Sequence, residues 1–76
     1  MRTSYKISED KFLEAKRAIT SNGGTIYSNS FEISGVEGHF DYSDGTLDIV
    51  ITDQPFLASD SMIKEKMDDF FLWRRR

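Results

Sequence analysis

Residues 35–51 read GVEGHFDYSDGTLDIVI, and this stretch decides the fold. Polar and apolar residues alternate on both sides of Asp44-Gly45, as they do in a strand with one buried face, because successive side chains point to opposite faces. An Asp-Gly pair suits a two-residue hairpin turn, since both central residues must tolerate positive φ. The stretch therefore predicts an antiparallel hairpin. Its apolar face carries two sets of residues separated by the turn, with Gly38 within the first: Val36, Phe40 and Tyr42, then Leu47, Ile49 and Ile51.

Shorter strands are predicted around this hairpin. The segments Thr25–Ser28 and Phe31–Ser34 read as two strands, and Gly35 marks a turn or bulge before the hairpin. Because consecutive antiparallel strands need only short loops, we expect a continuous meander over Thr25–Thr52. A further short strand is indicated at Thr3–Ile7.

A helix is predicted over Glu9–Ser21. Ser8 is suited to cap its first turn, because a serine hydroxyl accepts a hydrogen bond from an otherwise unpaired backbone N–H group. The sequence Asn22-Gly23-Gly24 ends the helix, since Asn and Gly accept the left-handed conformation that follows many helices. The spacing of the apolar residues predicts a buried stripe of Phe12, Ala15 and Ile19, with Ala18 beside it.

A second helix is predicted from about Ser61 to Trp73. Asp53-Gln54-Pro55 ends the meander, because proline cannot donate to a sheet ladder, and Ser59 or Asp60 caps the helix. We expect Phe56 and Leu57 to pack under the connecting loop. These elements give the order (β)αβββ(β)α within a single domain, residues 1–76. The predicted fold is a two-layer α+β sandwich, in which both helices cover one face of a three- or four-stranded antiparallel sheet.

Composition excludes several functional classes. The 76-residue chain has no cysteine, which excludes disulfides and thiolate chemistry, and its net charge of −3 includes the positive charge of three terminal arginines. The rest of the chain is negatively charged and lacks the basic surface that binds nucleic acids, so no nucleic-acid partner is expected. No apolar run approaches the roughly 18 residues of a membrane-spanning helix, and no secretory signal is visible. We therefore expect a cytoplasmic protein.

Four segments resemble the bacterial polyhydroxyalkanoic acid system proteins, a family of small granule-associated proteins. They are Tyr5–Ser8 leading into a helix with Glu14-Ala15, Gly35–Phe40, Gln54–Ala58 and Ile63–Met67. The resemblance covers most of the chain and implies a noncatalytic protein of undefined biochemical role. It also implies association with a lipid or polymer-granule surface.

Candidates for catalysis or metal binding centre on His39, the only histidine. Glu37 and Asp41 share its strand face, so the three side chains form a weak candidate metal site, although an ordinary exposed histidine is favoured. Asp41, Asp44 and Asp48 flank the hairpin and suggest a small hydrolase or isomerase as an alternative. Gly23-Gly24 and Gly35-x-x-Gly38 lack the spacing of phosphate-binding loops. We therefore expect no enzyme activity, no catalytic or metal-binding residues and no cofactor.

The end of the second helix is the most suggestive functional feature. Its apolar set covers more than one helix face, and a large exposed apolar patch usually marks an interaction site. We predict a noncatalytic protein–protein interaction module, which binds another protein or itself as a homodimer. A membrane or granule surface is the less favoured partner, because Asp68 and Asp69 interrupt the basic face that such a helix needs. The candidate interaction surface is Met67, Phe71, Trp73, Arg74, Arg75 and Arg76.

Overall fold

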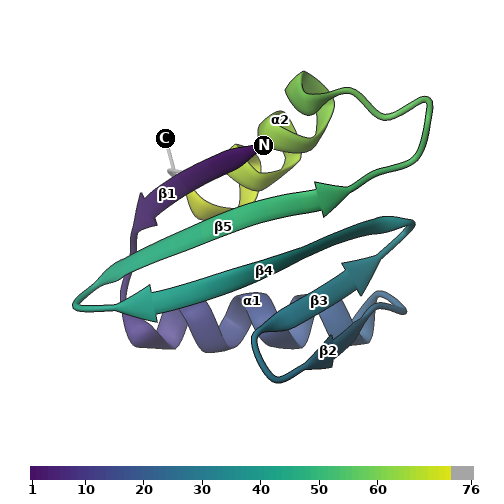
Figure 1. Ribbon diagram of the computed structural model, residues 1–76. Helices are drawn as coiled ribbons and strands as arrows, with labels where there is room; N and C mark the ends of the chain where they lie inside the picture. The colour runs from purple at the N-terminus through teal and green to yellow at the C-terminus, as the bar shows by residue number, and fades with distance from the viewer. Residues whose placement is uncertain (73–76) are drawn as a thin grey trace.

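Figure 1 shows the computed structural model, which describes residues 1–72. An antiparallel sheet of five strands, in the order β1-β5-β4-β3-β2, forms one layer of this part of the chain. Two helices form the other layer and lie behind the sheet in the view of Figure 1. The elements are β1 (Arg2–Lys6), α1 (Glu9–Ser21), β2 (Thr25–Tyr27), β3 (Ser30–Ile33), β4 (Val36–Ser43), β5 (Thr46–Asp53) and α2 (Asp60–Phe71).

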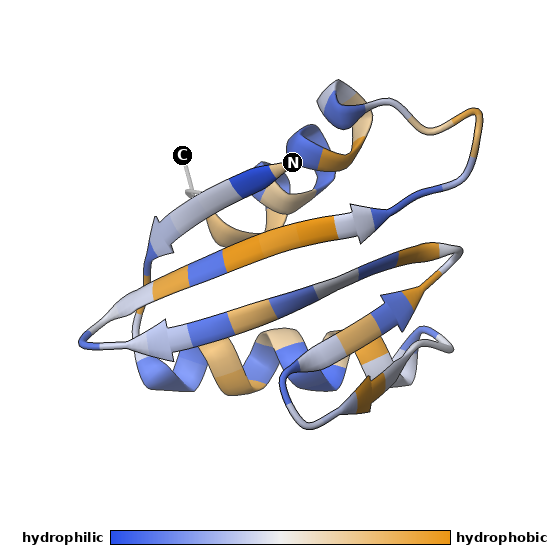
Figure 2. Cartoon of the chain, in the orientation of Figure 1, coloured by the Kyte–Doolittle hydropathy of each residue, from blue (hydrophilic) through white to orange (hydrophobic). Residues whose placement is uncertain are grey.

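The hairpin of β4 and β5 forms the centre of the sheet, as predicted. Asp44 and Gly45 make the turn with φ values of 52° and 76°, so both lie in the left-handed region. Ser43 faces Thr46 across the ladder. Phe40 and Leu47, which are 7% and 1% exposed, lie on the apolar face. Figure 2 shows blue, hydrophilic bands between the hydrophobic positions of β4, and a longer hydrophobic stretch along β5.

Strand β1 makes the sheet wider than the three or four strands predicted. It pairs antiparallel with β5 and places Tyr5 opposite Leu47. The Tyr5 side chain is 4% exposed and belongs to the same apolar cluster as the hairpin. The hydroxyl of Tyr42 also donates a hydrogen bond to the carbonyl of Ile7, at 2.8 Å, which fixes the start of α1 near the hairpin turn.

Both helices begin at the predicted caps. The backbone N–H group of Lys11 donates to the Ser8 hydroxyl at 3.1 Å, and α1 has the predicted bounds. The N–H group of Met62 donates to the Ser59 hydroxyl at 3.2 Å, so Ser59 rather than Asp60 caps α2. Side chains of both helices pack against the same core of the sheet: Phe12 and Ile19 from α1, and Ile63, Met67 and Phe71 from α2.

Gly38 lies at an irregular point of the β4–β5 ladder, where the backbone approaches its neighbours closely. The register of β4 against β5 shifts between Glu37 and Gly38, which marks a β-bulge. A methyl group at Gly38 would overlap the carbonyl oxygen of Val50 and approach the Phe31 ring to 3.1 Å. Because both neighbours are fixed by the sheet and the core, the close approach of these strands requires glycine at this position.

We expect Gly38→Ala to lower the free energy of unfolding by about 2 kcal/mol, because overpacking next to the backbone forces the strands apart. Urea denaturation followed by circular dichroism measures this change. Ser43→Ala, at an exposed position of the same strand, is the control and should change stability by less than about 0.5 kcal/mol. Equal stability of the two variants would contradict the close approach at Gly38.

Candidate functional site

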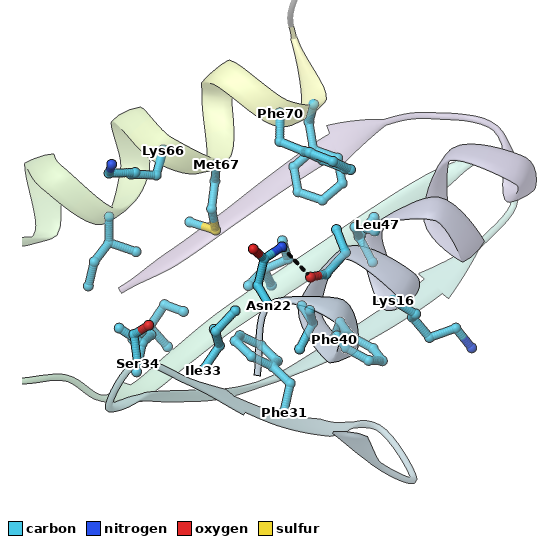
Figure 3. A pocket seen from close by; sticks show the side chains of 18 of the residues that line it. Lys16, Asn22, Phe31, Ile33, Ser34, Phe40, Leu47, Lys66, Met67 and Phe70 are labelled. Carbon is cyan, nitrogen blue, oxygen red and sulfur yellow. Dashed lines mark hydrogen bonds between the residues drawn. The ribbon is translucent and has the colours of Figure 1, made fainter. Parts of the chain in front are cut away.

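An open apolar cleft lies between α1 and α2, above the sheet. Its volume is about 600 Å³, within the range of ligand-binding clefts. Figure 3 shows side chains from both helices and from the sheet directed into the same space, with Met67 and Phe70 on one side and Phe31 and Phe40 on the other. Among the described residues that line the cleft, the charged ones are Lys16 and Lys66.

The position of α2 over the sheet depends on contacts with Tyr5. The Tyr5 hydroxyl donates to Asp68 Oδ1 at 2.6 Å, and the ring stacks on Phe71 with 4.7 Å between ring centres. Lys64 contacts the same carboxylate oxygen at 2.9 Å. Burial, and then the hydrogen bond to Asp68, raise the pKa of Tyr5 to about 12. The hydrogen bond from Tyr5, and then that from Lys64, lower the pKa of Asp68.

A hydrogen-bonded turn lies at one end of the cleft, between β5 and α2. The N–H group of Ala58 donates to the carbonyl of Pro55 at 3.0 Å, which closes a β-turn with Phe56 and Leu57 at its centre. The side-chain amide of Gln54 donates to the carbonyl of Ala58 at 2.8 Å and braces the turn. Pro55 and Ala58 both line the cleft, so the turn forms part of its wall.

Phe56 and Leu57 project from this turn into solvent, and the prediction that they pack under the loop is wrong. Their exposed fractions are 100% and 84%. The physical reason is the orientation of Pro55, which faces Gly35 in the turn between β3 and β4. A Cβ atom added to Gly35 would lie only 2.9 Å from Pro55 Cγ. This contact holds one side of the turn against the sheet, and the two central side chains point away. We call Phe56 and Leu57 the apolar tip.

Opposite charges surround the tip and the cleft. Asp53 and Asp60 flank the apolar tip in the sequence, one at the end of β5 and the other at the start of α2. Lys16 and Lys66 lie at the rim of the cleft, on different helices (Figure 3). The apolar tip and the apolar cleft therefore lie side by side. The tip is flanked by acidic residues, and the cleft has lysines at its rim.

The predicted interaction surface is divided between the core and the end of the chain. Met67 and Phe71 pack against the sheet and line the cleft, so they contribute to it from within. Trp73, Arg74, Arg75 and Arg76 lie outside the described residues. The apolar tip was not predicted from the sequence as a surface feature. The signal available was an adjacent pair of large apolar residues directly after a proline, within a connection too short to cover them.

The candidates around His39 lie on the opposite, polar face of the sheet. His39, Asp41 and Asp48 border one shallow hollow there, and Asp41 faces Asp48 across the ladder. Ser4 donates a hydrogen bond to Asp48. Asp44 stands apart in the hairpin turn. Within residues 1–72, no three His, Asp or Glu side chains are grouped so that they could hold a metal ion.

No family model matches the chain, and neither the curated proteins nor the solved structures contain a match. The resemblance to the polyhydroxyalkanoic acid system proteins stays a prediction. Within residues 1–72, neither helix has the length and apolar character needed to cross a membrane.

We expect the link between Tyr5 and α2 to make stability depend on pH in the alkaline range. The folded-state pKa of Tyr5, about 12, lies above its ordinary value of 10. The contribution of Tyr5 to the free energy of unfolding is therefore fully present below pH 10 and is lost as the pH rises through 12. At neutral pH, Tyr5→Phe should be roughly 1 kcal/mol less stable than the parent, because a hydrogen bond is lost.

Urea denaturation of the parent and of Tyr5→Phe, from neutral pH to pH 12, measures the difference between the two proteins. The comparison removes the effect of deprotonating the lysines that do not contact Asp68, because the two proteins share it. The stability advantage of the parent should shrink steadily above pH 10. An advantage that stays constant across this range would contradict the raised pKa of Tyr5.

Proposed function

We propose that this protein is a noncatalytic protein–protein interaction module, and that its binding surface is the apolar tip together with the adjoining cleft. The observation that carries the proposal is a fully exposed Phe56 held by a braced turn beside an open apolar cleft. Met62, which is 53% exposed on the first turn of α2, extends the same apolar region. A continuous exposed apolar surface of this kind usually marks an interaction site.

The energetics favour binding through the tip. Burying a phenylalanine or leucine side chain in a partner contributes about 1.5–3 kcal/mol relative to leaving it in water. Large aromatic anchors of this kind dominate the binding energy of many interfaces. The turn is held by the Gln54–Ala58 hydrogen bond and by the contact of Pro55 with Gly35, so little conformational entropy is lost when it binds.

Local charge favours a protein partner over a lipid or granule surface. Asp53 and Asp60 bracket the tip, and anionic headgroups would repel their carboxylates as Phe56 and Leu57 approached. Asp68 and Asp69 add negative charge to α2. The enzyme alternative depends on His39 and its acidic neighbours, which lie on the far face of the sheet. Cytoplasmic location and a bacterial source stay predictions.

The proposal predicts that a photo-reactive side chain at Phe56 will cross-link to protein in the source cell. Benzoylphenylalanine at position 56 should give a discrete protein adduct, identified by mass spectrometry as this chain or another protein. The control is the same group at Tyr27, an 84% exposed position on the edge strand β2, where no such adduct should form. Adducts to lipid alone, or equal adducts at both positions, would contradict the proposal.

Vesicle sedimentation distinguishes the alternative partner. With anionic vesicles, the protein should stay in the supernatant, because the acidic residues beside the tip oppose binding. Binding that is lost in Phe56→Ser would instead support attachment to a lipid surface. Since Phe56 is fully exposed, this substitution should leave the free energy of unfolding within about 0.5 kcal/mol of the parent.

A further inference from the structure

We infer that the partner is a second copy of this chain, and that the apolar tip of each copy inserts into the cleft of the other. The inference rests on the proposed function and adds the identity of the partner. It follows from two features that coexist on one molecule: an apolar projection without cover, and an apolar cleft with space of about 600 Å³. Insertion of the tip into the cleft would remove the apolar surface of both from water.

The chemistry of the two surfaces matches. Phe56 and Leu57 are the most exposed large apolar side chains at this end of the described molecule. The cleft presents aromatic and aliphatic groups, including Phe31, Met67 and Phe70, which Figure 3 shows facing one space. Aromatic side chains pair favourably with other rings and with methionine sulfur, so the cleft suits a phenylalanine anchor.

The charges also match, although the protein as a whole is acidic. Two copies with a net charge of −3 repel each other at long range, so a local attraction must overcome that repulsion. The acidic flanks of the tip, Asp53 and Asp60, would approach the basic rim of the cleft, Lys16 and Lys66. Attraction between the acidic flanks of the tip and the two lysines at the rim of the cleft would orient the contact and contribute some binding energy.

The position of the tip allows each copy to insert its tip into the cleft of the other. Pro55 and Ala58, which frame the tip, also line the cleft, so projection and cleft meet at one edge of the molecule. When this edge of one copy meets the same edge of another about a two-fold axis, each tip faces the other's cleft. Such an isologous contact closes at two copies, as in most homodimers.

Analytical ultracentrifugation of the full chain over a range of concentrations tests the inference. The parent should show a reversible monomer–dimer equilibrium. The double variant Phe56→Ser/Leu57→Ser should be monomeric at concentrations at which the parent is dimeric. Its circular dichroism should stay unchanged, and its unfolding curve should match that of the parent at dilutions at which both are monomeric. A matched control, Tyr27→Ser, removes an exposed ring elsewhere and should dimerise like the parent.

A charge exchange tests the reciprocal geometry. One variant carries Asp53→Lys and Asp60→Lys, and a second carries Lys16→Glu and Lys66→Glu. Each alone should dimerise at least about fivefold more weakly than the parent, because tip and cleft then bear like charges. An equimolar mixture should restore dimers, and native mass spectrometry should find the mixed dimer in large excess, since opposite charges then meet at both insertions.

The outcomes separate this inference from the proposed function. A parent that stays monomeric, a dimer unaffected by the tip variant, or a mixture that fails to restore association would each overturn the second-copy partner. If residue 56 nevertheless cross-links to a different protein, the interaction module stands and its partner is another chain. If residue 56 cross-links to no protein, the proposed function fails as well.

Discussion

Burial of one face of the β4–β5 hairpin is the constraint on which the rest of the structure depends. Leu47 and Ile49 are 1% and 4% exposed on this face, and the opposite face carries His39 and Asp41 in solvent. A strand whose register slipped by one residue would exchange the two faces, so the apolar set fixes the pairing. α1 and α2 cover the apolar side, β1 extends the sheet beside β5, and Tyr5 of β1 connects the sheet to α2.

A chain of this size covers that face incompletely. The two helices lie on a sheet of five strands, and the space between them remains as the cleft. Small domains bury a smaller share of their surface than large ones, so an open apolar region is a physical consequence of length as well as a candidate site. The turn at residues 55–58 increases the exposed apolar surface, because its bracing holds Phe56 and Leu57 outward.

Much of the fold could be predicted because its signals are local. Ser8 and the acidic residues after it mark the start of α1, the Asn22-Gly23-Gly24 sequence marks its end, and Asp44-Gly45 marks the hairpin. The number of strands was harder to predict, because β1 is short and its pairing with β5 joins residues 40 to 48 positions apart in the sequence. The site was harder still. Met67 and Phe71 were predicted as interaction residues from apolar content, yet they pack against the sheet and contribute to the cleft from within.

The sequence by itself determined the fold class, the bounds of α1, the central hairpin and the division of the sheet into an apolar and a polar face. These features follow from residue periodicity, capping and turn chemistry, which act over a few neighbouring residues. The tertiary structure alone decided that β1 joins the sheet, that a cleft stays open between α1 and α2, and that Pro55 faces Gly35 so that Phe56 and Leu57 point into solvent. The physical reason is distance along the chain. Each of these outcomes depends on contacts between segments that are far apart in the sequence, and local residue patterns do not predict such contacts.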